Sequence, residues 1–247
     1  MRLRSLLAVF AVLAMIATAC GDSGESAPEG FQIGIVAPSA SNDLAFTQSI
    51  VDAANALSGD PTILITDGTF VSEDAASAVR GYASDGVDLV IAHGSQYGVF
   101  LDEIAKDFPD TIFAWGTAAD TFGLPNVYAY EAASDEGGYV MGLMAAELTT
   151  TGNIGIVGPI EVGDAKLYVD GFEKGAVAGG ASVSKVYTGS FGDVALAQQA
   201  AEAFASQDVD VMSGTAQMVV GAVGVATTEN ILWFGTQSNQ SELGDIV

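Results

Sequence analysis

Few side chains in this sequence are placed for covalent or metal chemistry. His93 is the single histidine, which excludes most histidine-based catalysis and any metal site built from several histidines. Ser95 stands between the glycines of a nucleophile-elbow pattern, but one place too early. Asp208 and Asp210 resemble the start of a calcium loop, yet Ser213 occupies the position that needs glycine. We therefore expect no enzyme, no metal and no cofactor, and an α/β surface hydrolase remains only an alternative.

The only cysteine, Cys20, ends a short apolar run that follows Arg2 and Arg4. A positive start, an apolar stretch and small residues before a cleavage site are typical of an export signal. The segment 17–20 resembles the bacterial lipobox, in which the cysteine carries the lipid. We expect a lipoprotein signal peptide at 1–20, a flexible tether at 21–30 and a lipid-anchored protein outside the cytoplasm, in the periplasm or on the outer face of the cell membrane. A soluble exported protein is the alternative.

The charge of the chain limits its partners. The 247 residues include 31 acidic and 7 basic side chains, which gives a formal net charge of −24. Such a charge disfavours nucleic acid, anionic lipid surfaces and phosphate esters as partners. Because no cysteine follows Cys20, we expect no disulfide in the folded part.

From Phe31 onward, short β-rich apolar runs alternate with longer segments of helical periodicity. Near-continuous apolar strands that alternate with helices predict parallel sheets covered on both faces. The predicted strands are 31–38, 62–66, 88–92, 111–115, 127–130, 153–158, 182–188, 208–214 and 230–235. The predicted helices are 43–57, 72–84, 97–107, 134–148, 165–178, 194–206 and 217–228.

The alternation breaks once, where the polar loop 116–126 separates two predicted strands and a new series begins after 134. We therefore expect an α/β fold of two Rossmann-like lobes with parallel sheets, at 31–133 and 134–247. Ligands of such sheets lie beyond the carboxyl ends of the strands, so two facing lobes predict a cleft that a hinge can close. The chain ends soon after its last predicted strand, and we expect the second lobe to be incomplete.

Several segments of the chain have a composition and spacing typical of one family. A helix rich in small residues at 136–148 precedes a strand at 152–158, and the segments 171–176 and 189–193 follow, with 42–49 near the start. Together they resemble the basic membrane protein family of ABC-transporter solute-binding lipoproteins, which includes purine nucleoside receptors. The resemblance implies a type I periplasmic binding protein that captures a nucleoside or related small solute and delivers it to an ABC permease. A sensor for a membrane signalling partner is the alternative.

The resemblance also implies a ligand site with aromatic walls. Phe46 occupies the family position that stacks on a base, and Phe172 is the candidate from the second lobe. Asp43 is either a ligand contact or the cap of the next helix. Thr47 stands where the family has asparagine, and Trp115 is either a further wall or the end of a core strand.

Three positions depart from the family pattern. Ala37, Gly116 and Asn239 stand where acidic residues usually contact the ribose and base. Losing such acids removes charge-assisted hydrogen bonds of about 1.5–3 kcal/mol each. We keep Asn239 and Gly214 as ligand-binding candidates. His93 either faces the cleft or is a hydrogen-bonded residue at a strand end.

Overall fold

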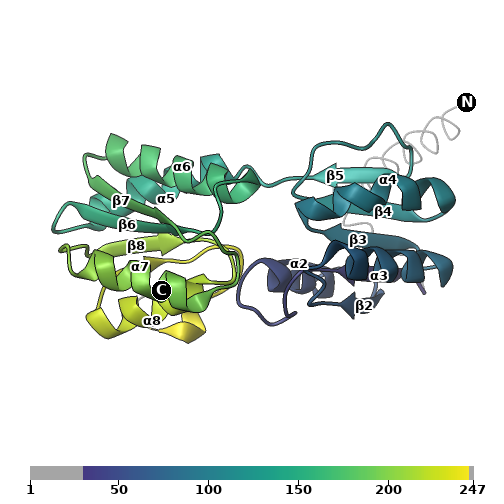
Figure 1. Cartoon of the computed structure of the whole chain (residues 1–247), viewed down its shortest axis with the longest axis horizontal. Coiled ribbons are helices and arrows are strands. Elements are labelled where there is room, and N and C mark those ends of the chain that lie inside the picture. The colour runs from purple at the N-terminus through teal and green to yellow at the C-terminus, as the bar shows by residue number, and fades with distance from the viewer. Residues whose placement is uncertain (1–29, 245–247) are drawn as a thin grey trace, which may run out of the picture.

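The computed structural model describes residues 30–244, so Cys20, the predicted signal peptide and nearly all of the predicted tether lie outside the described residues. The described chain forms two parallel sheets with helices on both faces, joined near residues 131–133 (Figure 1). The predicted α/β fold with parallel sheets is therefore confirmed. None of the helices within 30–244 is long and apolar enough to cross a membrane.

The first sheet has the strand order β2-β1-β3-β4-β5, and all its pairs are parallel. Its side chains alternate between two buried cores. Ile33 and Ile35 pack against α2 on one face, while Val36 and Val90 pack against α3 and α4 on the other. The elements are β1 (Gln32–Val36), α2 (Phe46–Asn55), β2 (Thr62–Thr66), α3 (Ser72–Ser84), β3 (Leu89–His93), α4 (Gly98–Asp107), β4 (Ile112–Gly116) and β5 (Val127–Tyr130).

The second sheet repeats this plan with the order β7-β6-β8-β9. In both sheets the first strand of the lobe lies between its second and third strands, which is the doubly wound arrangement. Ile154 and Ile156 pack beneath α5 and α6, and Val157 and Met212 pack against α7 and α8. The elements are α5 (Ser134–Leu148), β6 (Asn153–Gly158), α6 (Gly163–Ala178), β7 (Ser182–Tyr187), α7 (Val194–Ala205), β8 (Val211–Gly214), α8 (Val219–Glu229) and β9 (Leu232–Phe234).

Several predicted elements are shorter than their sequence pattern suggests, and in two of them a left-handed residue lies near the start. The helix predicted from 43 begins at Phe46, because Leu44 has a φ of 53°. The strand predicted from 208 begins at Val211, because Asp208 has a φ of 57°. A residue in this left-handed region continues neither a right-handed helix nor a strand.

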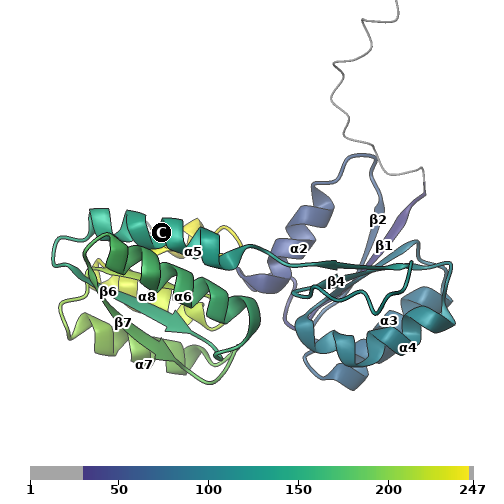
Figure 2. The same ribbon diagram turned by 90° about the horizontal axis from the view of Figure 1, so that it is seen from above.

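Helices α5 and α6 pack side by side over one face of the second sheet (Figure 2). Four glycines, two on each helix, lie in this contact: Gly138, Gly142, Gly171 and Gly175. A Cβ atom on any of them would overlap the backbone of the facing helix. Residues without a side chain thus allow the two backbones to approach closely, and the small-residue helix noted in the sequence is explained by packing.

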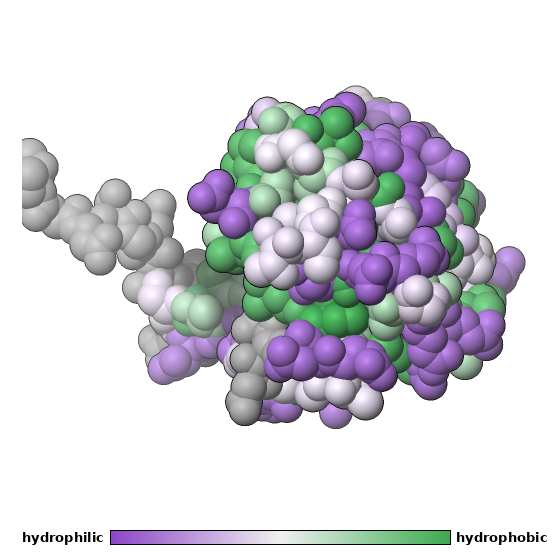
Figure 3. All heavy atoms as spheres, turned by 90° about the vertical axis from the view of Figure 1, so that its left-hand side faces the viewer, coloured by the Kyte–Doolittle hydropathy of each residue, from purple (hydrophilic) through white to green (hydrophobic). Residues whose placement is uncertain are grey.

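The outer end of the second lobe mixes hydrophilic and hydrophobic residues (Figure 3). Lys166 pairs with Glu161 and Asp170, and Lys185 pairs with Asp170 and Glu173. Exposed pairs of this kind contribute little to stability. Acidic neighbours neutralise both lysines, so these side chains do not create a basic surface.

Candidate functional site

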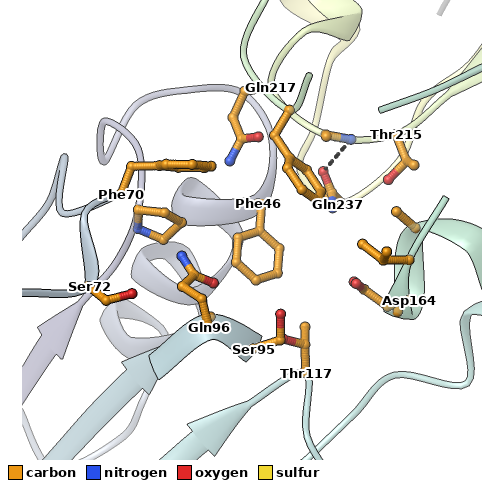
Figure 4. Close-up of a pocket in the computed structure, with 17 residues that line it drawn as sticks. Phe46, Phe70, Ser72, Ser95, Gln96, Thr117, Asp164, Thr215, Gln217 and Gln237 are labelled. Atoms are coloured by element: carbon orange, nitrogen blue, oxygen red, sulfur yellow. Dashed lines mark hydrogen bonds between the residues drawn. The ribbon is translucent and has the colours of Figure 1, made fainter. Parts of the chain in front are cut away.

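A cavity of about 240 Å³ lies between the two lobes, where strands of both sheets reach their carboxyl ends (Figure 4). We call it the aromatic chamber, because three phenylalanines line it together with amide and hydroxyl side chains. Its lining residues are Pro38, Phe46, Phe70, Ser72, Gly94, Ser95, Gln96 and Thr117 from the first lobe, and Val162, Gly163, Asp164, Ala165, Phe191, Thr215, Ala216, Gln217 and Gln237 from the second.

A second cavity of about 470 Å³ adjoins the first on the side of the linker. We call it the hinge chamber. Its lining combines the aromatic rings of Phe46, His93, Tyr130 and Tyr168 with hydroxyl groups and with small or apolar residues. The two chambers share the lining residues Phe46, Thr117, Asp164, Thr215 and Gln237. They are therefore two compartments of one interlobe cleft, and the aromatic chamber is the one lined by aromatic side chains from both facing loops, Phe70 and Phe191.

Phe46 is the first residue of α2 and lines both chambers. One face of its ring stacks on the imidazole of His93, with 3.9 Å between ring centroids and 16° between planes. Figure 4 shows the ring in the middle of the chamber-lining residues. The structure thus brings Phe46 to the cleft, while its stacking on a ligand remains a prediction.

His93 holds Phe46 in place. Its Nε2 lies 3.1 Å from the carbonyl oxygen of Phe46, and its Nδ1 lies 2.7 Å from the hydroxyl of Tyr130. A carbonyl oxygen only accepts, so Nε2 carries the proton, and the neutral ring accepts from Tyr130 at Nδ1. Burial lowers the pKa of His93 to about 4, although the carbonyl of Phe46 and the charge of Asp43 oppose this shift. His93 is therefore neutral at pH 7, lines the hinge chamber and is also a hydrogen-bonded strand-end residue.

Asp43 caps α2. Its carboxylate accepts from the backbone N–H groups of Thr47 and Gln48, at 3.1 and 3.0 Å, and from the hydroxyl of Ser39 at 2.6 Å. Thr47 is fully buried and its hydroxyl bonds to Ser39 at 2.7 Å. Neither residue lines either chamber. The structure favours the capping alternative for Asp43, and the ligand contact expected of Thr47 is wrong because its hydroxyl faces the protein.

Phe172 and Trp115 belong to the core. Phe172 is fully buried and packs beside Tyr168 and Phe234, with ring centroids 6.1 and 6.5 Å away. It lies on the face of α6 that packs on the sheet, so its expected place in the cleft is wrong. The ring of Trp115 stacks on Phe122, and its Nε1 donates to the carbonyl of Gly94 at 3.0 Å. Trp115 therefore lies one residue before the end of β4, packs against the core of the first lobe and lines neither chamber.

Gly214 and Asn239 also lie outside both chambers. Gly214 is needed for packing, since a Cβ atom there would come within 2.8 Å of the carbonyl oxygen of Val157. Asn239 is exposed, and its side chain accepts from the N–H of Ser241 at 3.0 Å. This arrangement does not bring either residue to the cavity, because Gly214 abuts backbone and Asn239 faces solvent, so their ligand contacts stay untested predictions.

The sequence analysis missed the aromatic pair that faces across the cleft. Phe70 from the first lobe and Phe191 from the second lie 6.4 Å apart between ring centroids. Each follows the carboxyl end of a strand, β2 or β7. That position could have predicted both residues as part of the site, because loops after parallel strands form the ligand site in this class of sheet. Phe191 supplies the second-lobe aromatic side chain that we expected from Phe172.

The lobes also touch beside the chamber. The Nε2 atom of Gln217 donates to the hydroxyl of Ser39 at 2.8 Å, and that of Gln240 donates to the carbonyl of Leu44 at 3.1 Å. Gln237 accepts from the N–H of Ala216 within the second lobe (Figure 4). The cleft is thus closed over the chamber, and polar groups of both lobes are fixed around it.

Asp164 is the acidic residue of the cleft. It lies in the first turn of α6, and its pKa is raised by burial and by the charge of Glu131, while the backbone N–H of Ala165 opposes the shift. Figure 4 shows its carboxylate among the chamber-lining groups. The described residues contain no group of three or more His, Cys, Asp or Glu side chains placed to hold a metal ion. The cleft is therefore suited to hold a small organic molecule by stacking and hydrogen bonds.

Similarity to known proteins agrees with this architecture. The chain is 29% identical to a purine-binding protein of Brucella abortus over 67% of its length and 47% of the relative. It is 26% identical to the transcriptional activator protein med of Bacillus subtilis over 69% of its length and 52% of the relative. The chain thus spans about half the length of these relatives.

A solved structure of an ABC transporter solute-binding protein from Conexibacter woesei superimposes with a TM-score of 0.73 at 25% identity. The match covers 85% of this chain and 72% of that protein, which confirms the predicted type I periplasmic binding architecture. The family model for PnrA-like ABC transporter substrate-binding proteins, named Bmp, matches residues 31–245. The chain therefore belongs to the Bmp family of ABC transporter substrate-binding proteins.

Proposed function

We propose that this protein captures a nucleoside or a related flat solute in the aromatic chamber and delivers it to an ABC permease. The observation that carries the proposal is the position of Phe46, Phe70 and Phe191 around one closed interlobe cavity. Aromatic faces suit a flat ring, and the amide and hydroxyl groups around them suit a hydroxylated or nitrogen-rich substituent. A relative that is named a purine-binding protein supports the same ligand class.

Capture and release require the lobes to separate. Residues 131–133 link β5 to α5 and are exposed, so we assign the hinge to them. The hydrogen bonds of Gln217 and Gln240 across the cleft would form on closure and break on opening. A ligand that contacts both lobes stabilises the closed form because it binds that form better.

The direct test is calorimetric titration of the purified protein with a panel of nucleosides and free bases. Phe46→Ala should weaken binding about 5- to 150-fold, since stacking on one base is worth about 1–3 kcal/mol. The matched control is Phe122→Ala, because Phe122 stacks on Trp115 and lines neither chamber. If no member of the panel releases heat or binds by a second method, the proposal that the ligand is a nucleoside is wrong.

Lipid anchoring is tested separately. We expect Cys20 to carry the acyl chains that hold the protein at the outer side of a membrane. Cells expressing the protein with Cys20→Ser should release it to the soluble extracytoplasmic fraction and should not incorporate labelled fatty acid into it. Unchanged membrane retention of this variant would contradict a lipid anchor at Cys20.

A sensor remains the second candidate function, because one relative is named a transcriptional activator. The two functions predict different losses in cells that lack the protein. An importer component is needed for uptake of the labelled solute. A sensor is needed for a change of transcription on solute addition, and its loss leaves uptake intact.

A further inference from the structure

The residues that line the aromatic chamber carry acceptors whose capacity the protein itself does not fill. Asp164 is the ionisable side chain among its lining residues; the others, all within 30–244, are uncharged. Asp164 forms none of the ion pairs found in the described part of the chain. The backbone N–H of Ala165, at the start of α6, favours the charged form of its carboxylate and so opposes the rise in its pKa. A carboxylate has about four acceptor sites, so capacity remains for a ligand.

Gln217 supplies the second free acceptor. Its Oε1 is buried and has no hydrogen-bond partner among the described residues. The orientation of this amide follows from its neighbours. The Ser39 hydroxyl donates its one proton to the Asp43 carboxylate at 2.6 Å, so Ser39 must accept from Gln217. The contact is therefore through Nε2, and Oε1 is left without a donor among the described residues of this chamber-lining side chain.

Resting on the nucleoside-like function proposed above, we infer that the chamber selects solutes that carry an amino group or a protonated nitrogen, with Asp164 as the specificity-determining residue and Gln217 as a second acceptor. A buried acceptor or carboxylate without a donor is costly, so the ligand must supply donors to be bound tightly. The faces of Phe46, Phe70 and Phe191 also favour a cationic or electron-poor ring over an anionic one.

The test compares solutes that differ only in one group. Adenosine and cytidine carry an exocyclic amino group where purine riboside and 2-pyrimidinone riboside carry hydrogen. We expect the native protein to bind the amino member of a pair about 10- to 100-fold more tightly, because the other member has no donor at that position for the carboxylate. In Asp164→Asn the amino group meets a neutral acceptor, so the ratio within each pair should fall by about 5- to 10-fold.

The matched control is Asp193→Asn. Asp193 also lies at a helix start, where it accepts from the N–H groups of Ala195 and Leu196, but it lines neither chamber. It should lower thermal stability slightly and leave the ratio of affinities within each pair unchanged. A ratio that is near one in the native protein, or that survives in Asp164→Asn, overturns the inference while binding itself still supports the proposed function. Absence of binding by both members of each pair counts against the nucleoside class instead, and protonated heterocyclic amines would then test the acceptor site alone.

Discussion

Phe46 and Phe172 both lie in helices, yet one lines the cleft and the other is a core side chain. Phe46 is the first residue of α2 and stands at the edge where the first sheet ends, so its ring enters the cleft. Phe172 lies in the middle of α6, on the face that packs on the second sheet, and is fully buried. The position of a residue along its helix, relative to the carboxyl edge of the sheet, therefore separates a ligand wall from a core side chain.

The same contrast holds for the regions around them. The cleft edge contains residues other than glycine in the left-handed region: Leu44, Thr117, Ala216 and Gln237 have φ values of 53°, 56°, 74° and 70°. Such residues cost about 1–3 kcal/mol each and cluster at functional sites. The α5–α6 contact is built instead from regular helices and glycines that touch backbone. One region holds strained loops around a cavity, and the other has no room for a methyl group.

The largest effect should come from Phe172→Ala, which removes a fully buried ring. Truncations of this kind cost about 3–5 kcal/mol, so the midpoint of denaturant unfolding should fall sharply. The affinity of the protein that remains folded should change little, because Phe172 lines neither chamber. If this variant does not fold, Phe172→Leu gives the same test with a smaller loss. A selective loss of affinity in either variant would contradict our assignment of Phe172 to the core.

The second largest effect is a decrease in the free energy of unfolding at low pH that is caused by His93. The pKa of His93 is lowered from 6.5 to about 4 in the folded protein. Above pH 6.5 both the folded and unfolded states hold the neutral ring. As the pH falls from 6.5 to 4 the unfolded chain gains the proton first, so the free energy of unfolding drops by about 3 kcal/mol from this group.

The control for that prediction is His93→Gln. Its amide can still donate to the carbonyl of Phe46 and accept from Tyr130, but it does not titrate. The free energy of unfolding is measured by denaturant for both proteins between pH 7 and 4. The carboxylates contribute equally to both pH dependences, so the difference between the two curves is the contribution of His93. Parallel stability curves over this range would show that the ring is accessible to protons in the folded state.

Periodicity alone predicted much of the fold. The helix at 134–148 and the strand at 153–158 begin and end where the pattern predicts. The site was harder to predict, because residue type alone does not distinguish Phe172 from Phe191. A phenylalanine within a helical repeat is usually a core residue. Phe191 could be predicted as a site residue only from its position after the carboxyl end of a strand. The free acceptor of Gln217 could not be predicted, since it depends on Ser39, which is 178 residues away in the chain.

The smallest effect we predict compares two glycines of α5. A Cβ atom at Gly142 would overlap the backbone of α6 at Phe172, whereas one at Gly137 meets nothing within 4 Å. Gly142→Ala should therefore cost about 1–3 kcal/mol by overpacking. Gly137→Ala should be neutral or stabilising by up to about 1 kcal/mol, because alanine favours the helix.

Both glycine variants add one methyl group to the same helix, so helix propensity cannot explain opposite signs in their thermal midpoints. Opposite signs would show that Gly142 is required because the two helix backbones approach closely, and not merely that α5 tolerates small residues. Equal midpoints for the two variants would mean that α6 can move away from α5 at little cost. The contrast between a tightly packed helix pair and a strained cleft edge around a cavity would then not hold.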